Sequence, residues 1–418
     1  MTAGPGRPPA IAPARFGARI QAARETLRAG GDVALLVGVG ADLRWLTGYD
    51  AMNLERLTML VLPRDGEPVL VAPRLEAPRA SLAPAVAAGL VRLIAWEETE
   101  DPVAQVPGLV RAASATGGAT VVADGAAGPA SETGLGAWPA PAGARPPRLL
   151  VSDRLGASFV LRLQAAFPRV PFGLASDVLR GLRMAKDADE IALLRAAAEA
   201  ADRVVLAIAG GRLVGRTEAD VAREVRERLL DEGHETAEFA IVGSGPNSAS
   251  PHHDASDRRI SAGEPIVLDI GGAFDGYGSD ITRTLWVTGA AGASPDTGFV
   301  RLYEVLREAQ AAATAAVRPG VPAERIDATG RSVIAAAGFG PNFIHRIGHG
   351  IGLEGHEDPY LVAGNREPLQ PGNTFSVEPG IYLEGRHGAR IEDIVVCGVA
   401  GPDVLNRVTR DLLVVHGT

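Results

Sequence analysis

The chain has 418 residues, a formal net charge of −9 and 46% hydrophobic residues. This length exceeds the size at which one hydrophobic core usually stops growing, so two domains are expected. The acidic balance does not suit a protein whose main partner is a phosphate backbone, and the composition excludes collagen-like and disordered polymers. We therefore expect a globular protein that does not bind nucleic acid.

The single cysteine and the single lysine restrict the chemistry further. Cys397 lies in an apolar run and is expected to be a buried strand thiol, which favours a reducing, cytoplasmic compartment. Lys186 follows Ala185 and not a glycine, so the chain has no P-loop. No run of about 18 uncharged apolar residues and no signal peptide is found, so no membrane association is expected.

The first half of the chain alternates between helical and strand patterns. Asp65-Gly66 predicts a hairpin turn, and Gly38-Val39-Gly40 predicts a tight turn because it lacks the third glycine of a dinucleotide-binding loop. Helices are predicted over 13–28 and 102–113, and strands over 34–39, 57–62, 68–71, 90–94 and 120–123.

The middle and second half of the chain are richer in helices at first and in strands at the end. Residues 125–148 are dense in Ala, Gly and Pro and predict a long surface loop. Asp187 begins a predicted helix with acidic residues where the helix dipole favours them. Helices are predicted over 157–167, 176–184, 187–209, 218–232, 297–317 and 323–337. We place the domain boundary near Lys186, giving an α/β domain over 1–185 and an α+β domain over 186–418.

Four predicted strands of the second domain carry acids where a core-facing strand should be apolar, namely Asp269, Asp280, Glu378 and Glu392. A salt bridge at the surface would explain one of them, but four suggest a shared charged ligand, because an isolated buried carboxylate is costly. Asp269 and Asp280, like Glu378 and Glu392, flank a turn, so hairpin pairing would bring like charges to roughly 5 Å. With His349 the set offers oxygen and nitrogen donors without a thiolate, which favours two Mn²⁺ or other first-row divalent ions.

The motifs that contain these residues resemble those of the creatinase/aminopeptidase P family of pita-bread metallopeptidases. This family includes the Xaa-Pro dipeptidases, or prolidases, and the Xaa-Pro aminopeptidases. The matching motifs span 268–272, 279–284, 345–356, 376–382 and 390–393, and residues 43–49 extend the resemblance loosely to the first half. The resemblance implies a C-terminal pita-bread catalytic domain of α+β class, preceded by a creatinase-like α/β N-terminal domain that gates the site and mediates a homodimer.

The resemblance also implies the roles of the metal ligands. Asp269 would chelate one ion, His349 and Glu378 would bind the other, and Asp280 and Glu392 would bridge both. A hydroxide between the ions would attack the peptide carbonyl, and Glu378 would pass the proton to the leaving nitrogen. Manganese is the expected metal, with cobalt, zinc and iron as alternatives.

Further residues are assigned to the substrate and to the surroundings of the ligands. His252, 17 residues before Asp269, and His356, seven after His349, would steady the oxyanion and the substrate. His253 is an alternative to His252, and His345 is read as structural or as a neighbour of the ligands. Arg390 would orient the ligand acids. Tyr382 would contact the substrate or serve only in packing.

The expected activity is hydrolysis of the bond between an N-terminal residue and proline in short peptides. The sequence leaves open whether the enzyme is a dipeptidase or an aminopeptidase P, and segments 358–366 and 53–56 are candidates for the gate that decides it. Ala389 stands where the family usually has a larger aliphatic residue. The alternatives are a pita-bread hydrolase or lyase for a small non-peptide substrate, such as an ectoine- or creatine-like compound, and a binding module without catalysis.

Overall fold

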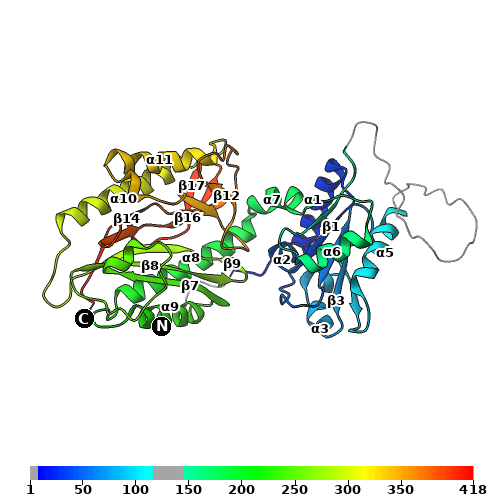
Figure 1. Cartoon of the computed structure of the whole chain (residues 1–418), viewed down its shortest axis with the longest axis horizontal. Helices are drawn as coiled ribbons and strands as arrows, with labels where there is room; N and C mark the ends of the chain where they lie inside the picture. Colours follow the sequence, from blue (N-terminus) through cyan, green and yellow to red (C-terminus); the bar gives the residue numbers. More distant parts are fainter. Residues whose placement is uncertain (1–7, 116–144, 418) are drawn as a thin grey trace, which may run out of the picture. The chain divides into compact units, whose positions relative to one another are not determined.

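The computed structural model describes residues 8–115 and 145–417, which form two compact units (Figure 1). The first contains Ile11–Arg183, and the second contains the residues from Met184 onward together with residues 8–10. The predicted strand over 120–123 and residues 125–144 of the predicted loop lie outside the described residues. Each unit has its own sheets and its own core.

The first unit contains a six-stranded mixed sheet in the order β4-β3-β2-β1-β5-β6. The hairpin predicted at Asp65-Gly66 is confirmed by the antiparallel pairing of β2 with β3, whereas β1 with β5 and β5 with β6 are parallel. The strands are β1 Ala34–Gly38, β2 Met59–Pro63, β3 Val69–Pro73, β4 Arg92–Trp96, β5 Leu149–Val151 and β6 Phe172–Leu174. The sequence patterns did not predict β5 and β6, which have three residues each.

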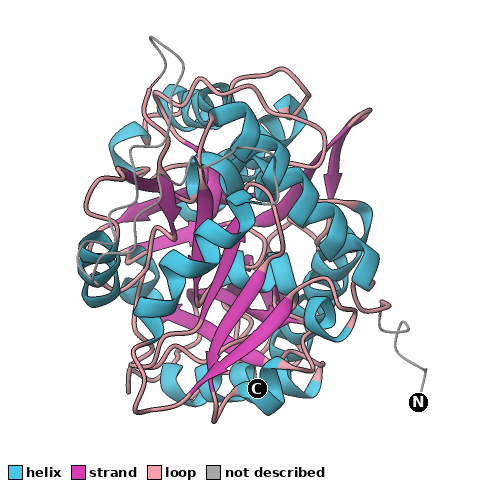
Figure 2. Ribbon diagram, turned by 90° about the vertical axis from the view of Figure 1, so that its right-hand side faces the viewer, coloured by secondary structure: helices cyan, strands magenta, loops and turns pink. Residues whose placement is uncertain are grey.

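Helices pack on this sheet because its strands are apolar on both faces. Val106 of α5 and Leu163 of α6 are buried in one core with Leu36 and Val61 of the sheet. Figure 2 shows helices on either side of the strands. The helices are α1 Pro13–Gly30, α2 Ala41–Thr47, α3 Ala77–Ala80, α4 Pro84–Ala87, α5 Pro102–Ala115, α6 Ala157–Ala166 and α7 Ser176–Met184. Gly40, with a φ of 142°, begins α2, so the glycine pair makes a turn into a helix, as predicted.

The second unit contains two larger sheets and a hairpin. One sheet has the order β18-β10-β8-β7 with β9 paired to β8, the other has the order β12-β11-β13-β16-β17, and β14 pairs with β15. The strands are β7 Thr236–Ser244, β8 Glu264–Phe274, β9 Tyr277–Gly278, β10 Ile281–Val287, β11 Gly348–Gly350, β12 Glu357–Leu361, β13 Thr374–Val377, β14 Gly380–Leu383, β15 His387–Arg390, β16 Asp393–Gly398, β17 Gly401–Val404 and β18 Leu413–Val415. The helices are α8 Ala188–Ala209, α9 Glu218–Asp231, α10 Thr297–Ala316 and α11 Ala323–Ala336, with short 3₁₀ turns η1 Gly245–Ala249 and η2 Gly340–Asn342.

Each sheet of the second unit is covered by its own pair of helices. Helices α8 and α9 share a core with β7, β8 and β10, and α10 and α11 share a second core with β13 and β16 (Figure 1). The two sheets therefore face each other between two helical layers, and the α+β fold predicted for this part of the chain is confirmed. Cys397 is buried in the second core, as expected.

The start of α8 follows from its sequence. The side chain of Asp187 accepts hydrogen bonds from the backbone N–H groups of Asp189 and Glu190, and Glu190 accepts one from the backbone of Asp187. This reciprocal capping satisfies N–H groups that the first turn of a helix leaves free. None of the described helices combines the length and the hydropathy needed to span a bilayer.

Candidate metal centre and active site

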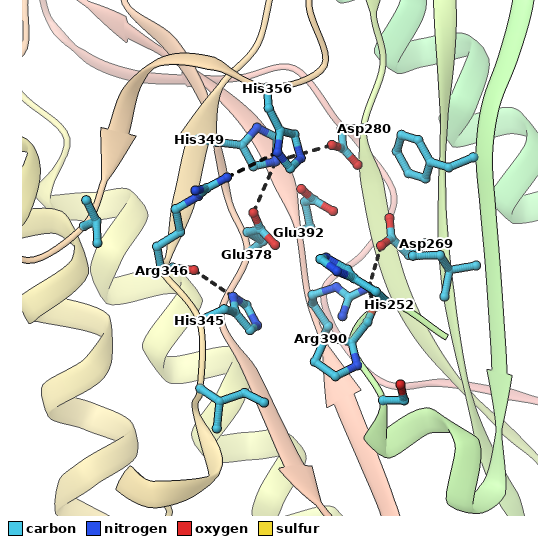
Figure 3. Close-up of a pocket in the computed structure, with 16 residues that line it drawn as sticks. His252, Asp269, Asp280, His345, Arg346, His349, His356, Glu378, Arg390 and Glu392 are labelled. Atoms are coloured by element: carbon cyan, nitrogen blue, oxygen red, sulfur yellow. Dashed lines mark hydrogen bonds and ion pairs between the residues drawn. The ribbon is translucent and has the colours of Figure 1, made fainter. Parts of the chain in front are cut away.

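The four acids singled out in the sequence converge on one cavity of about 890 Å³ in the second unit (Figure 3). Asp269 lies within β8, but Asp280 precedes β10, Glu378 follows β13, and Glu392 lies between β15 and β16. The prediction that all four lie within strands was therefore wrong for three of them. Next to Glu378, Pro379 has no N–H to donate and interrupts the ladder, so the chain leaves β13 there and resumes pairing in β14.

The register of the hairpins differs from the prediction for the aspartates. Asp269 pairs with Thr282 and not with Asp280, because the turn is centred between Asp275 and Gly276, one residue beyond the midpoint of the two aspartates. An offset of two residues keeps both carboxylates on the same face, since side chains alternate with a period of two. For the glutamates, Val377 pairs with Asp393 on one side and Gly380 pairs with Arg390 on the other. Both pairs have the same register, so Glu378 lies opposite Glu392, as predicted.

His349 completes this group from β11. Its Nε2 lies 3.3 Å from Oε1 of Glu378 and 3.7 Å from Oδ2 of Asp280. Nδ1 of His349 lies 3.1 Å from the carbonyl oxygen of Gly350, which leaves Nε2 directed at the acids. The neighbouring Gly348 has to be glycine, because a Cβ there would lie 1.9 Å from the carbonyl oxygen of Ser376.

The acids repel one another in the absence of a cation. Burial first, and then the charges of Glu392 and Asp269, raise the pKa of Asp280 well above its usual value. Burial and the charge of Glu378 do the same to the pKa of Glu392, and burial raises the pKa of Glu378 to about 7. Burial, with His356 nearby, lowers the pKa of His349 to about 3, so this imidazole is neutral and able to ligate a metal.

This donor set fits divalent metal ions. Ligand atoms of Asp280, His349 and Glu392 lie within 4.8 Å of one another, and all three residues are buried. Oδ1 of Asp269 is buried and has no hydrogen-bond partner among the described residues, which a bound cation would supply. Asp269, Asp280, His349, Glu378 and Glu392 would hold the metal, and their oxygen and nitrogen atoms suit hard or borderline ions.

Two of the histidines predicted to contact the substrate line the same cavity. His252 lies in its wall near Asp269, whereas His253 does not line it and binds Oε2 of Glu218 at 2.8 Å (Figure 3). The structure therefore favours His252 over His253. The ring of His356 lies over that of His349, with centroids 3.8 Å apart.

A buried ion pair holds the segment that carries His356. Glu357 accepts a hydrogen bond from Nζ of Lys186 at 2.7 Å, and both side chains are buried. A Cβ at Gly352 would lie 2.6 Å from Oε1 of Glu357, so the close packing of this loop on the ion pair requires glycine. The only lysine of the chain thus holds the residue next to His356.

Arg390 connects two of the four acids of the cavity. It donates to Oδ2 of Asp269, to Oγ1 of Thr282 and to the hydroxyl of Tyr382. Thr282 in turn donates to Oε2 of Glu392 at 2.7 Å, so one guanidinium orients two of the four acids.

Tyr382 and His345 lie beside Arg390. The Tyr382 hydroxyl is 3.0 Å from Nε2 of His345, and Tyr382 is buried and is not among the residues that line the cavity. The structure thus shows no cavity surface on Tyr382 for the substrate contact we had expected. His345 does line the cavity, and burial lowers its pKa to about 4.

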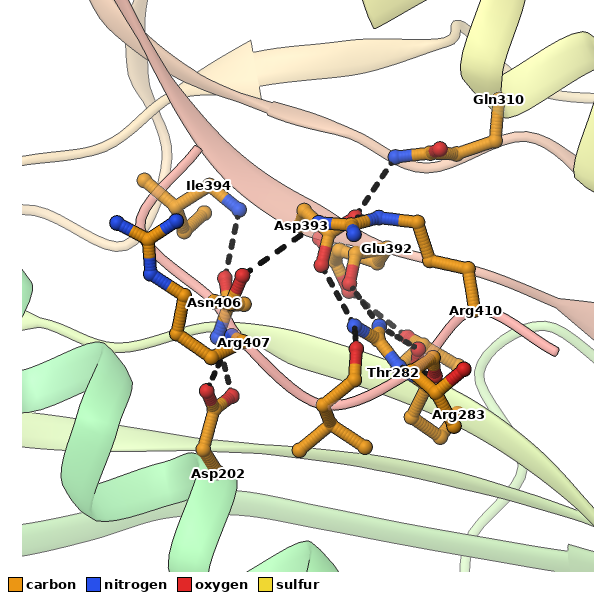
Figure 4. Close-up of polar contacts among 12 residues, drawn as sticks. Asp202, Thr282, Arg283, Gln310, Glu392, Asp393, Ile394, Asn406, Arg407 and Arg410 are labelled. Atoms are coloured by element: carbon orange, nitrogen blue, oxygen red, sulfur yellow. Dashed lines mark hydrogen bonds and ion pairs between the residues drawn. The ribbon is translucent and has the colours of Figure 1, made fainter. Parts of the chain in front are cut away.

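A buried polar network behind Glu392 was missed by the sequence analysis (Figure 4). Arg283 is fully buried and donates to the carbonyl oxygen of Glu392 at 2.6 Å and to Oδ1 of Asp393 at 2.7 Å. Asp393 also accepts from Gln310 and Arg410. Arg283 belongs to the motif over 279–284, where only the aspartate drew attention. A charged residue inside a strand that begins with Ile281 and ends with Leu285-Trp286-Val287 was itself a signal of a buried ion pair.

The cavity wall contains further residues that the sequence did not predict. Arg346 lines the cavity next to His356, although its motif had been quoted for the histidines alone. The apolar part of the wall is formed by Phe239, Ile241, Ile344 and Val362. Apolar cavity residues spread over several elements have no local pattern, so the sequence offers no means of finding them.

Comparisons with known proteins address the whole chain. The model of metallopeptidase family M24 matches residues 192–398, and that of the creatinase/prolidase N-terminal domain matches residues 19–185. A probable dipeptidase PepE of Mycobacterium tuberculosis is 43% identical over 407 residues, which cover 96% of this chain and 98% of that protein. The chain belongs to metallopeptidase family M24. The predicted family, hydrolase class and fold are thereby confirmed.

Solved structures of M24 proteins agree over nearly the full length. Dipeptidase PepE from Mycobacterium ulcerans has a TM-score of 0.83 at 40% identity, covering 97% of this chain and 100% of the other. A prolidase from Thermococcus sibiricus has a TM-score of 0.81 at 31% identity, with the same coverage. Membership of family M24 implies divalent metal ions, which is consistent with the donor set described above.

Proposed function

We propose that the protein is a dinuclear-metal exopeptidase that hydrolyses the bond between an N-terminal residue and proline, acting as an Xaa-Pro dipeptidase. The observation that carries this proposal is the convergence of the five ligands Asp269, Asp280, His349, Glu378 and Glu392 with His252 and His356 on one cavity. Relatives named dipeptidase and prolidase support it. Manganese is the metal we propose, because the donors are carboxylates and one imidazole.

Two divalent ions, when bound, supply the Lewis acidity that activates water and polarises the scissile carbonyl. In this proposal Glu378 takes the proton of the attacking water and carries it to the leaving nitrogen. In the metal-free protein, burial raises the pKa of Glu378 to about 7. Ser376, which donates to Oε1 of Glu378 at 3.1 Å, fixes the orientation of this carboxyl.

The proton on His356 can be assigned from its neighbour. Nη2 of Arg346 lies 3.2 Å from Nδ1 of His356, and a guanidinium can only donate, so Nδ1 accepts. Burial, and then the charge of Arg346, lowers the pKa of His356, so the ring is neutral and carries its proton on Nε2. That N–H is available to an oxyanion that develops on the carbonyl of the substrate.

The preference for proline follows from the shape of the site and the chemistry of the bond. The amide nitrogen of proline has no hydrogen, so the substrate cannot be recognised there as an ordinary extended strand. The apolar wall of the cavity, which includes Phe239, Ile241 and Val362, offers surface for the pyrrolidine ring instead.

The test is the cleavage of Ala-Pro and Ala-Pro-Ala by Mn²⁺-loaded protein, repeated after chelation. We expect chelator-sensitive cleavage of Ala-Pro, two Mn²⁺ per chain by elemental analysis, and a lower metal content in Asp269→Asn. Absence of cleavage with both ions bound would reject the peptidase proposal and direct the search to small non-peptide substrates. Preferential cleavage of Ala-Pro-Ala would make the enzyme an aminopeptidase P.

A further inference from the structure

His234 is a buried histidine between α9 and β7 that does not line the cavity. Nδ1 of its ring lies 3.1 Å from the carbonyl oxygen of Leu229, and its Nε2 lies 2.8 Å from Oγ of Ser279. A carbonyl oxygen can only accept a hydrogen bond, so Nδ1 carries the proton and Nε2 is an acceptor. Burial lowers the pKa of His234 to about 4, so the ring is neutral at neutral pH.

The hydroxyl of Ser279 is oriented by this imidazole. Its single proton has two acceptors within reach, Nε2 of His234 at 2.8 Å and the carbonyl oxygen of Gly272 at 3.3 Å, and the imidazole is the nearer one. Oγ is then the acceptor for the N–H of Gly272, whose nitrogen lies 3.1 Å away. One hydroxyl thus joins the loop after helix α9 to strand β8.

This contact lies where the ladder of β8 is interrupted between β9 and β10. Gly272 faces Ser279 there, because the residue pairs on either side share one register. These pairs are Ile270 with Ile281 and Ala273 with Gly278. The N–H of Ser279 donates to the carbonyl oxygen of Gly272 at 2.8 Å, as in a regular antiparallel pair. In the other direction the N–H of Gly272 donates to the hydroxyl, which takes the place that a backbone carbonyl has in a regular ladder.

Asp280 is the residue that follows this contact, and Asp269 lies on the strand that the contact reaches. Neighbouring residues of an extended chain point to opposite sides, so Ser279 is directed at His234 while Asp280 lines the cavity. The hydroxyl and the imidazole therefore fix the backbone of Asp280 relative to β8, from the side that faces away from the cavity.

A fixed backbone matters at this position because Asp280 is repelled by its neighbours. The charges of Glu392, Asp269 and Glu378 all disfavour a negative charge on Asp280. A carboxylate on a loose backbone would turn away from these charges, and the conformational entropy lost in bringing it back would weaken the binding of a cation. A backbone that is already held avoids this loss.

We propose that His234 and Ser279 are positioning residues that hold Asp280 in place for metal binding. This inference rests on the metal centre of the proposed function and extends it to two residues that do not line the cavity. Loss of either residue should lower the affinity for divalent ions while all five proposed ligands stay in the chain.

The experiment titrates Mn²⁺ calorimetrically into the metal-free full-length protein. We expect His234→Leu and Ser279→Ala each to bind Mn²⁺ about 10- to 100-fold more weakly than the wild type, the usual effect of removing a residue that orients a ligand. The double variant should bind no more weakly than the weaker single variant, because both residues act through one hydrogen bond. His234→Gln, whose amide oxygen can accept the proton of the Ser279 hydroxyl, should recover most of the affinity.

Thr288→Val is the matched control for Ser279→Ala. Thr288 is buried and follows β10 at the end opposite to Asp280, and its hydroxyl donates to the carbonyl oxygen of Val415 at 3.2 Å. Both substitutions remove one hydroxyl beside an end of the same strand, so both should lower the melting temperature of the metal-free protein. Only Ser279→Ala should weaken the binding of Mn²⁺.

The outcomes separate the two proposals. If the wild type takes up no Mn²⁺, the metal centre and with it the proposed function fail. If the wild type binds two ions and His234→Leu and Ser279→Ala bind them equally well, the metal centre stands and the positioning role is overturned. An equal loss of affinity in Thr288→Val would also overturn it. Each titration is made at a temperature at which circular dichroism shows that protein to be folded, so that lost stability is not counted as lost affinity.

Discussion

Asp280, Glu378 and Glu392 bring like charges together in the wall of one cavity. Asp280 and Glu392 are buried and Glu378 is partly buried beside other carboxylates, and each has a raised pKa in the metal-free protein. The guanidinium of Arg390 forms an ion pair with Asp269 and so neutralises only part of the negative charge of the four acids. Charge at these positions therefore opposes folding until cations enter.

This predicts a pH-dependent effect of metal on stability. A carboxyl with a folded-state pKa near 7, against about 4.5 when unfolded, adds no penalty below pH 4.5, and the penalty grows until about pH 7. The melting temperature of the chelated protein should thus fall between about pH 5 and about pH 7.5. Saturating Mn²⁺ should raise it by about 5 °C or more at the higher pH and much less at the lower one.

Asp280→Asn is the matched variant for this measurement by scanning calorimetry. It removes one of the repelling charges, so its chelated form should melt at a higher temperature than the chelated wild type at the higher pH. Its gain on adding Mn²⁺ should be smaller. An equal gain at both pH values in the wild type would contradict the assignment of these acids as ligands.

At the scale of elements, Glu218 joins the N-terminus of α9 to the loop that carries His252. The carboxylate accepts hydrogen bonds from Ser244, Asn247, His253 and Ser256. Burial alone would raise the pKa of Glu218, but these hydrogen bonds outweigh it and lower the pKa to about 2. The N-terminus of the helix also favours a negative charge there.

We predict that Glu218→Gln destabilises the protein by about 3 kcal/mol at neutral pH, the equivalent of the pKa difference from 4.5. A carboxylate with a depressed pKa stabilises fully above pH 4.5 and loses this contribution as the pH falls toward 2. The difference between wild type and variant in denaturant unfolding should therefore shrink across that range. Glu224→Gln, on the same helix but paired with Arg216 and Arg228 nearer the surface, should cost less than about 1 kcal/mol.

The elements also show what the sequence could and could not predict. Long amphipathic helices such as 187–209 were predicted within a residue or two, because many positions contribute to one period. Strands of three residues, such as β5, have too few positions for a pattern. The four acids that line the cavity were found from their charge in apolar runs, but the register of Asp269 depended on the centre of one turn, and Arg346 became visible only as part of a cavity.

At the scale of the molecule, the residues that line the cavity and the exposed apolar side chains considered next lie in different units. The four acids and His349 lie in residues 184–417, and the first unit presents exposed large apolar side chains, among them Leu75, Leu82 and Leu161. We propose that the protein is a homodimer and that residues 1–185 mediate the association. A second subunit packed on these leucines would remove their apolar surface from water.

Light scattering after gel filtration checks this proposal. The whole chain should have about twice its mass of 43.2 kDa, whereas residues 186–418 alone should be monomeric. A monomeric whole chain would reject the dimer. A dimer of residues 186–418 would move the interface to the catalytic domain.

The ion pair between Lys186 and Glu357 gives this protein an internal reporter. Because the chain has one lysine, and its ε-amine is buried and bonded to a carboxylate, reagents that acylate lysine side chains will leave that amine unmodified in the native protein. Acylation of Lys186 requires the packing around it to open. The rate at which this one amine is labelled, followed by mass spectrometry, will therefore measure how often the loop of His356 comes away from its support.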